Sequence, residues 1–590
     1  MSKKSHYKLP LVVILLSVVI AVTVLATPTG EIKEVGVLHE KRALSDSLHS
    51  SYSKDKNLYG VNSTEDVEQK FGDRVYGGIV SHHLLANIDM AKFFYEFSDQ
   101  EVDRVIIIGP NHFYPIAFPA LSTIYDYETP FGEVLIDNKF IDGLKSEKLV
   151  QIDEGTIDTE HSISSLVPYV AHYLPDAEVV PIILTRNVPD DLLKGLADYF
   201  KKNNTENTIV IASVDFSHHL YSNASALHDL RSVSAIKSFD IESLNELELD
   251  SPQSISVLLQ YLEAINAKDV SVWQQNAALI FDEYDIDDVT SYVFAHARKG
   301  NNEAVPGASM LFFGDTMLGR GVEEAIEDKT DLFSGIRGPE GNFLKGYDAI
   351  AVNLEGAIAS DECELEDDEL VIDPDNLDIL VQENISHVGV KNNHFQKCDE
   401  EASKSIVEET GFKSLGDFSV VEGTGHDIAV MSVYAAPVSS DTTLIVDEVR
   451  SYADTYENLV VNIHWGVEYS TEPTKAQTEL AHAIVDAGAD IIIGHHPHVV
   501  QTVEKYNDGL IAYSLGNFIA DQEGELTNTG LAAGVFFGED DKKLFLFPFK
   551  QINGVPTHLT QADSREVCEN MVEFVNDDSV HPCVLTSDNY

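Results

Sequence analysis

The chain has 590 residues, too many for one compact core, so we expect two or more domains. Its 98 acidic and 39 basic residues give a formal net charge of -59 at pH 7, which repels nucleic acid phosphates and anionic lipids. The charge therefore argues against a nucleic acid-binding role. It is compatible with divalent cations, with cationic partners, or with a saline environment that screens self-repulsion.

The first 26 residues have the pattern of a targeting segment. Lysines at positions 3, 4 and 8 precede an uncharged apolar run of 18 residues from Leu9 to Ala26, "LPLVVILLSVVIAVTVLA". Positive charge before such a run predicts a cytoplasmic N-terminus with the rest of the chain outside. The run suits a single-pass anchor, and Val24-Leu25-Ala26 also suits signal cleavage, so both alternatives stay open. We expect extracytoplasmic domains on the cell membrane, or a secreted protein.

Composition divides the rest of the chain into two large regions. Residues 27–70 are polar and predict a linker or stalk. In residues 71–298 and 308–560, short β-branched runs alternate with amphipathic stretches, the pattern of a mostly parallel α/β sheet. "KGNNEAVPG" at 299–307 predicts a linker between them, and 561–590 an acidic C-terminal tail. The fold class is therefore two α/β domains behind an N-terminal membrane segment.

One helix is predicted clearly, within "TKAQTELAHAIVDAGAD". Its apolar residues share one face, and Gly488 is well placed to end it before a buried strand, "IIIG".

The four cysteines suggest disulfides. In an oxidising compartment we expect the local pairs Cys363–Cys398 and Cys568–Cys583. Four cysteines allow three connectivities, so the sequence does not fix the pairing. A C-x-x-C pair is absent from the sequence, which gives no indication of a structural zinc knuckle.

In the second region, five apolar runs are each followed by residues of metal-ligand type. In an open α/β sheet, ligands bind at the carboxyl ends of the strands, so we expect these side chains to meet in one crevice. Mixed oxygen and nitrogen ligands suit Mn, Fe, Zn or Co. Taken singly, each is more often an ordinary polar residue. The set is Asp315, Asn353, Glu355, Asn392, Asn393, His394, His464, His495, His496 and His498. By His-x-His spacing, His496 and His498 are the expected ligand pair, with His495 packed beside them.

The blocks "GDTMLGR", "VNLEG", "KNNH", "NIHWGVEY", "GADIIIGHHPHVVQ" and "YSLGNF" occur in this order over about 250 residues. Together they resemble the capsule-synthesis protein family (CapA/PgsA, the poly-γ-glutamate synthesis group). The resemblance implies a membrane-anchored, extracytoplasmic protein with a calcineurin-like metallophosphoesterase fold. It also implies a role in cell-envelope or capsule polymer metabolism, with partner proteins of a capsule synthesis and export complex.

The same resemblance implies specific roles for these residues. Divalent metal ions (Mn, Fe or Zn) would be held by Asp315, Glu355, Asn393, His464, His496 and His498. The catalytic residues would be His394, as acid near the leaving group, with Asp315 and His464, and the substrate pocket would include Asn353, Ser514 and Asn517. Lys397 stands where the family usually has an aspartate, which puts activity in question. The alternative is a non-catalytic accessory protein that guides an anionic polymer during export.

The first region carries a second set of histidines and carboxylates. Its blocks "SHH", "GPNH", "EHS" and "DFSHH" resemble the Memo family (AmmeMemoRadiSam system protein B), which is similar in fold to LigB-type extradiol dioxygenases. The resemblance implies a metal-binding pocket with Glu160 and His161 beside the ligands, and a dioxygenase-like oxidoreductase is a further alternative. Asp250 stands where the family usually has cysteine, and an oxygen ligand favours a harder metal such as Fe or Mn. The expected ligands are His82, His112, Asp215, His218 and Asp250.

Overall fold

The computed structural model describes residues 48–62, 72–113, 118–276, 287–302, 307–359, 370–397, 400–424, 426–522, 524–538, 541–573 and 581–587. These residues belong to one compact unit. The expected membrane segment at 1–26, most of the linker at 27–70, and Cys363 and Cys398 lie outside the described residues. None of the helices in the described part of the chain combines the length and apolar character needed to cross a membrane.

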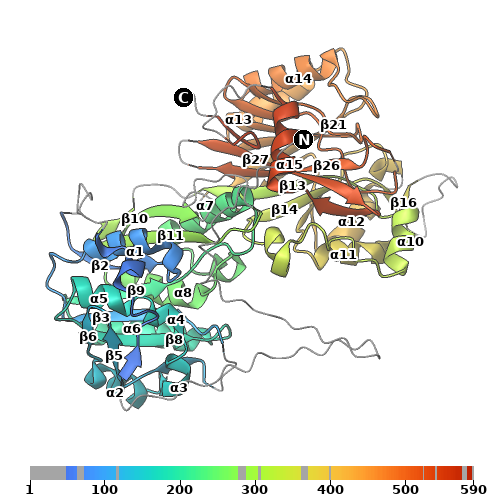
Figure 1. The fold of residues 1–590 in the computed structure, drawn as a ribbon. Coiled ribbons are helices and arrows are strands. Elements are labelled where there is room, and N and C mark those ends of the chain that lie inside the picture. Colours follow the sequence, from blue (N-terminus) through green and yellow to red (C-terminus); the bar gives the residue numbers. More distant parts are fainter. Residues whose placement is uncertain are drawn as a thin grey trace, which may run out of the picture. The chain divides into compact units, whose positions relative to one another are not determined.

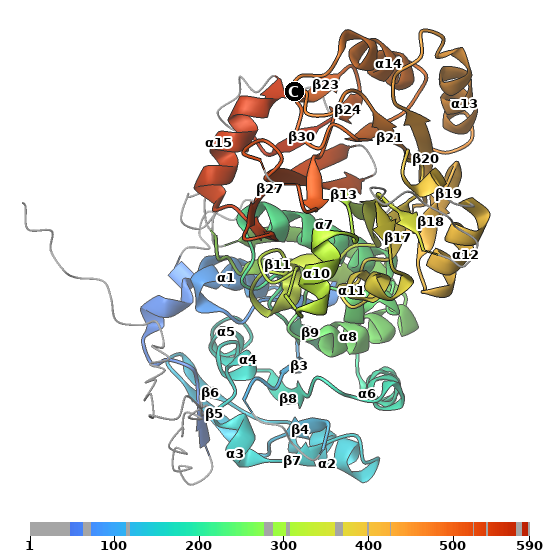
Figure 2. The same cartoon turned by 90° about the vertical axis from the view of Figure 1, so that its right-hand side faces the viewer.

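The first region is built on a nine-stranded mixed sheet (Figure 1). Its central strands β2, β9, β3 and β8 run parallel and are buried along nearly their whole length, as expected for a sheet covered on both faces. The short strands β4 and β7 form one end of the sheet, beside α2 and α3 (Figure 2). In sheet order the strands are β12 (Gly300–Asn301), β10 (Ala267–Asn276), β11 (Ser291–Arg298), β2 (Val75–Val80), β9 (Thr208–Ser213), β3 (Arg104–Pro110), β8 (Glu178–Leu184), β4 (Ala120–Ser122) and β7 (Gln151–Ile152).

Helices pack on this sheet and carry its loops. Leucines and aromatic residues of α6 and α8 join the same hydrophobic core as the isoleucines and valines of β3 and β9. The helices are α1 (Asn87–Tyr95), α2 (Asn138–Ser146), α3 (Glu154–Ile157), α4 (His161–Ser164), α5 (Val167–Tyr173), α6 (Asp190–Asn203), α7 (Ser222–Ser238) and α8 (Pro252–Ala264).

A small three-stranded sheet, made by β1 (Leu48–Ser50), β5 (Asp126–Thr129) and β6 (Gly132–Val134), lies beside the large one. His49 in β1 is fully buried, and its Nδ1 lies 3.1 Å from Asp158 Oδ1 while its Nε2 lies 2.9 Å from Glu154 Oε2. These contacts tie the first described strand to the helical segment around α3.

The second region is built on two large sheets that pack face to face, and it also contains a two-stranded sheet of β15 (Ala357–Ile358) and β16 (Val371–Ile372). Apolar side chains from both contribute to one core, with Met310 and Phe312 on the first sheet and Ile491 and Ile493 on the second. The first sheet runs β18 (Lys413–Leu415), β17 (His387–Gly389), β14 (Ala349–Leu354), β13 (Ala308–Thr316), β26 (Thr529–Phe537), β27 (Lys542–Ile552) and β28 (Val555–His558), with β25 (Asn517–Ile519) on β13 and β30 (Val584–Thr586) on β27. The second runs β19 (Phe418–Val421), β20 (Ile428–Ala435), β21 (Leu459–Trp465), β22 (Ile491–His495), β24 (Gly509–Ala512), β23 (Val503–Tyr506) and β29 (Val572–Glu573).

Helices α13 and α14 cover the outer face of the second sheet (Figure 1). The predicted helix is α14, Lys475–Asp486, and it begins with a capping box in which Thr474 and Gln477 satisfy each other's backbone N–H groups. Gly488 follows with a φ of 112°, which only glycine adopts easily, and β22 comes next. Helix and strand confirm the prediction. The other helices are α10 (Gly321–Glu327), α11 (Asp378–Val381), α12 (Glu400–Glu409), α13 (Thr443–Ala453) and α15 (Gln561–Met571).

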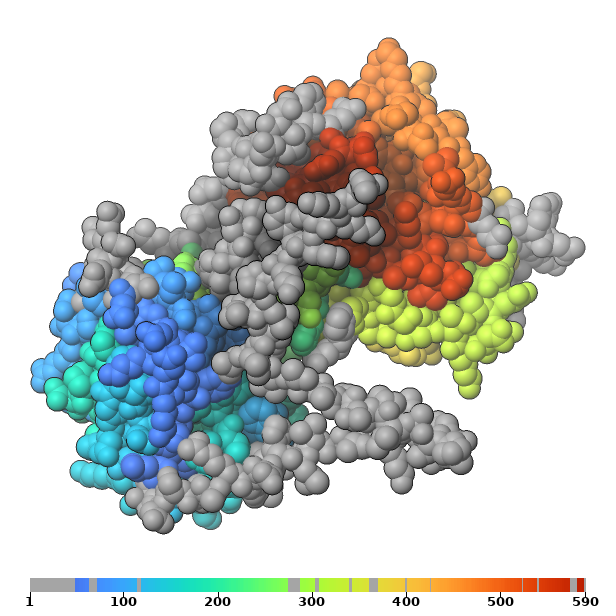
Figure 3. Space-filling model, in the orientation of Figure 1, coloured from blue at the N-terminus to red at the C-terminus, as the bar shows by residue number. Residues whose placement is uncertain are grey.

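The closing segment, expected as an acidic tail, contains α15, β29 and β30, and these two strands extend the two sheets. Figure 3 shows red residues of the C-terminal part of the chain beside orange residues of the second region. The predicted disulfide Cys568–Cys583 is confirmed, with a Cα–Cα separation of 5.3 Å and both cysteines fully buried. It ties α15 to the strand that pairs with β27.

Candidate metal centres

The second-region site lies where strands of both sheets end. Asp315 follows a bulge in β13 at Gly314, where a Cβ would lie 1.9 Å from the Gly516 carbonyl oxygen, so only glycine allows the turn. On the other sheet, His464 of β21 lies opposite His495 of β22. The sequence suggested that all ligands lie in one crevice of one open sheet. In the structure, each of the two packed sheets contributes part of the ligands.

The loop after β22 holds two histidines in unusual backbone conformations. His496 has a φ of 97° and His498 a φ of 58°, both in the left-handed region that non-glycine residues rarely adopt. The backbone N–H of His496 donates to Asp315 Oδ2 at 3.2 Å, and His498 Nδ1 lies 3.1 Å from the same oxygen. Strain of this kind collects at functional sites, where surrounding contacts hold it in place.

Polar contacts connect the strand ends into one network. Asn353 Nδ2 donates to Asp315 Oδ1 at 2.8 Å and lies 3.3 Å from His464 Nδ1. On its other side, His464 Nε2 lies 2.8 Å from Asn393 Oδ1. His498 Nδ1 also lies 3.1 Å from Asn517 Oδ1. The imidazoles are thereby fixed in orientation before any ligand binds.

Glu355 is the exception in this network. Its side chain is fully buried, and among the described residues neither carboxylate oxygen has a hydrogen-bond partner. Burial and the neighbouring charge of Asp315 raise the pKa of the Glu355 carboxyl above its usual range. A buried carboxylate without donors is costly unless a cation or a proton compensates it. The residue therefore fits a site for a bound cation.

Two sets of ligand atoms each lie within 4.8 Å of one another: Glu355 with His496 and His498, and Asp315 with Glu355 and His464. Glu355 belongs to both. Burial alone would lower the pKa of His498, but its bond to Asp315 and the charge of Glu355 raise it to about 9. Burial lowers the pKa of His464 well below its usual value, so its ring is held neutral, the form that binds metal. His495 is in neither set, and its Nε2 lies 2.8 Å from Asn462 Oδ1.

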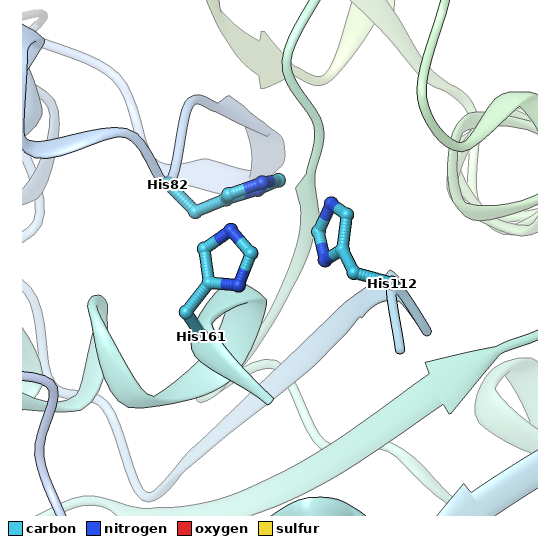
Figure 4. Close-up of side chains that lie close together, drawn as sticks. All are labelled: His82, His112 and His161. Carbon is cyan, nitrogen blue, oxygen red and sulfur yellow. The ribbon is translucent and has the colours of Figure 1, made fainter. Parts of the chain in front are cut away.

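The first region brings three imidazoles together at the ends of β2, β3 and the start of α4. Figure 4 shows the rings of His82, His112 and His161 turned toward one another. Their centroids lie 5.2 Å apart for His82 and His112, 5.1 Å for His82 and His161, and 4.3 Å for His112 and His161. His161 begins α4, whose N-cap is Glu160. Their ligand atoms form one compact set.

Carboxylates surround these rings. His112 Nδ1 lies 2.8 Å from Glu160 Oε1, and Asp250 Oδ2 lies 3.3 Å from His82 Nε2 and 3.6 Å from His112 Nε2. Within the described structure both oxygens of Asp250 lack a hydrogen-bond partner. His82, Asp215 and Asp250 form a second ligand set. This donor set of imidazoles and carboxylates again fits a metal of the Fe or Mn type.

Two histidines of this pocket have pKa values shifted in opposite directions. Burial alone would lower the pKa of His112, yet its contacts with Asp250 and Glu160 raise it to about 10. Burial and the adjacent His82 lower the pKa of His161 to about 3. The pKa is raised for one imidazole and lowered for the other although their ring centroids lie 4.3 Å apart, an arrangement in which a bound cation can replace a proton.

Comparison with known proteins agrees with both regions. Residues 309–522 match the family described as bacterial capsule synthesis protein PGA_cap, and residues 79–284 match the family of Memo-like proteins. The chain joins a Memo-like region to a PGA_cap region. This confirms the resemblance of both sets of sequence blocks.

Individual relatives support the same division. PGA biosynthesis protein CapA of Bacillus subtilis is 30% identical over 249 residues, 36% of this chain and 63% of that protein. Capsule biosynthesis protein CapA of Bacillus anthracis is 61% identical over 64 residues, 11% of this chain and 16% of that protein. A MEMO1 family protein of Saccharolobus islandicus is 28% identical over 179 residues, 29% of this chain and 60% of that protein. The chain thus spans less than two thirds of each of these relatives.

The other residues predicted for the two sites differ in their burial and in their contacts with the ligand sets. In the PGA_cap region, His394 Nε2 lies 3.7 Å from Glu355 Oε1 with its side chain partly exposed, and Ser514 is buried with its hydroxyl accepting from the Gly516 N–H. Lys397 ends a short turn and is exposed. In the Memo-like region, His218 is half-buried on the loop after β9 and joins neither ligand set of the described residues.

Sequence reasoning missed several residues that support the ligands. Ser81 donates a short hydrogen bond to Asp215, and Ser213 Oγ lies 3.1 Å from His82 Nδ1. Asn462, which contacts His495, lies two residues before His464 and therefore on the same face of β21. Ser213 has the same two-residue relation to Asp215. For Asn462 the signal was the alternation along β21, since a polar residue two positions before His464 shares its face.

Proposed function

We propose that the PGA_cap region is a metal-dependent hydrolase or transferase that acts on a cell-envelope or capsule polymer. The observation that carries the proposal is Glu355, a fully buried carboxylate without hydrogen-bond donors that belongs to two ligand sets. Metal ions are expected to be Mn, Fe or Zn, held by Asp315, Glu355, Asn393, His464, His496 and His498. Such ions polarise a phosphoryl or acyl oxygen and lower the pKa of water.

The chain's own residues supply the rest of the chemistry. We expect His394 to act as the acid that gives a proton to the leaving group; this role is supported by its Nε2, 3.7 Å from Glu355 Oε1, and by its partly exposed side chain. Asn353 and Asn393 hold the His464 ring from both sides, so its orientation does not depend on substrate. Asn517 does the same for His498.

We propose that the Memo-like pocket is a second metal site, made by His82, His112, His161, Asp215 and Asp250, which accepts Fe or Mn. The chain is proposed to act outside the cytoplasm, either anchored by its first 26 residues or secreted after their removal. Its partners are proposed to be the polymer itself and proteins of a capsule synthesis and export complex.

Turnover of a model phosphodiester tests the hydrolase proposal. The full chain, stripped and reloaded with Mn, Fe or Zn, should cleave bis(p-nitrophenyl) phosphate. His394→Asn should lower kcat by roughly 100-fold with its metal content retained. His219→Asn, at an exposed histidine, is the control and should leave both unchanged. A chain that takes up no metal and stays inert with all three ions overturns the proposal. Capsule polymer binding without turnover would favour the accessory role.

A further inference from the structure

A cavity of about 250 Å³ lies next to the proposed metal centre and contains none of its ligands. Its walls come from the chain after β17, from β20 and from α13, and the residues used below are Lys391, Asp417, Ser432, Tyr434 and Glu448. Tyr434 connects the two places, because its ring lies 6.0 Å from that of His464, centroid to centroid. A ligand bound in the cavity would therefore extend toward the metal centre.

Strand register places two residues of the cavity wall, Ser432 and Tyr434, on the same face of the sheet as the metal ligand His464, whereas α13 reaches the cavity from the outer face. Tyr434 of β20 pairs with His464 of β21, and Ser432 pairs with Asn462. Residues two apart in a strand point to the same face, and directly paired residues share it. Ser432 and Tyr434 therefore continue the surface on which His464 stands, one strand nearer the edge of the sheet.

The cavity carries charges of both signs. Lys391 is half-buried, and its ammonium lies 2.8 Å from Asp417 Oδ1 and 3.1 Å from Glu400 Oε1. An ammonium has three N–H donors, so these two partners leave one for a ligand carboxylate. Asp417 and Glu448 also line the cavity, and both carboxylates are exposed. They offer acceptors for a ligand ammonium.

A buried hydroxyl completes the lining. Ser432 is only 5% exposed, and its Oγ has no hydrogen-bond partner within the described part of the chain. Its backbone N–H already donates to the Asp417 carbonyl at 3.1 Å. Buried hydroxyls nearly always have a partner, so one without any that faces a cavity indicates a ligand contact.

We propose that this cavity is a subsite for a small zwitterion, an amino acid or a dipeptide, with its carboxylate at Lys391, its ammonium at Asp417 and Glu448, and a hydrogen bond to Ser432. The inference rests on the proposed function only in that the rest of such a ligand would reach the metal centre. It names the substrate class of that site as one that carries free amino and carboxyl groups.

Three related probes test the subsite by calorimetry on the full chain: L-alanyl-L-alanine, its N-acetyl derivative and its C-terminal amide. The free dipeptide should bind at least roughly tenfold more tightly than either blocked form, since each block removes one charge-assisted contact. Lys391→Met and Glu448→Gln should each weaken the dipeptide by a similar factor. The controls Lys475→Met and Glu479→Gln alter an exposed ion pair on α14 and should leave dipeptide binding unchanged.

Ser432→Ala distinguishes a ligand contact from a structural one. A buried hydroxyl without a protein partner does not stabilise the fold, so this variant should keep or raise the wild-type midpoint of thermal unfolding while binding the dipeptide more weakly. The proposal would be overturned if all three probes bound equally or if the dipeptide did not bind detectably. It would also be overturned if the Lys391 and Ser432 variants bound the dipeptide as tightly as the wild type.

The same experiment in stripped and reloaded protein separates this proposal from the proposed function. Dipeptide binding that survives chelation, in a chain that also fails to turn over phosphodiester, supports the subsite and counts against the hydrolase. Metal uptake and phosphodiester turnover without dipeptide binding would support the hydrolase and count against the subsite.

Discussion

Replacing Glu355 by glutamine removes one charge and almost no volume from the centre of the proposed metal site. In the metal-free chain the Glu355 carboxylate is buried without donors beside Asp315, so its ionised form is unfavourable. Glutamine should therefore change the free energy of unfolding of the metal-free chain by no more than about 1 kcal/mol, or raise it. With metal present, the same substitution should be strongly destabilising.

The size of the second effect follows from the geometry. Glu355 belongs to both ligand sets, whereas His464 and His496 each belong to one. A ligand at one hundred times its dissociation constant stabilises the folded state by about 2.7 kcal/mol per site. Two occupied sites give about 5 kcal/mol in the wild type, and Glu355→Gln should lose nearly all of it. His496→Asn should lose about half.

Denaturant unfolding in chelator and in excess Mn, with metal content measured on the same samples, checks this prediction. Glu479→Gln, on the exposed face of α14, is the matched control and should match the wild type in both conditions. The reasoning is refuted if Glu355→Gln destabilises the stripped chain as much as the loaded one, or if it keeps its metal.

Three further predictions concern other parts of the chain. Cys568→Ala with Cys583→Ala opens a 15-residue loop and should lower the free energy of unfolding by about 3 kcal/mol in urea titrations. Burial raises the pKa of the Asp229 carboxyl from 3.8 to about 7, so its contribution to stability is complete below pH 4 and is lost as the pH rises through 7. Asp229→Asn should abolish this loss, about 4 kcal/mol, when unfolding is compared at pH 4 and pH 8. Asp250→Asn should lower Fe or Mn bound in the Memo-like region, measured by elemental analysis, and leave phosphodiester turnover unchanged.

Much of the fold was predictable because its signals are local. Alternating apolar runs and amphipathic stretches identify the strands and helices, and Thr474 and Gly488 mark the ends of α14. Ligand-type residues after apolar runs located Asp315 and His464 at strand ends. These patterns depend on neighbouring residues in the sequence.

What the sequence could not supply is long-range. The carboxyl ends of β13 and β21 belong to different sheets, and only their packing brings Asp315 near His464. The sharing of Glu355 between two ligand sets depends on that packing. So does the place of His161 among the rings of His82 and His112, since α4 must lie against the ends of β2 and β3. The cavity beside Tyr434 has no sequence signal, because its charges come from separate elements.

The most direct test of the central claim is anomalous diffraction from crystals of the full chain grown with Mn. We predict anomalous density within coordination distance of the Glu355 carboxylate, in the ligand set with His496 and His498 or in the set with Asp315 and His464, which Glu355→Gln removes. A well-ordered Glu355 without such density, in crystals that bind Mn elsewhere, would contradict it.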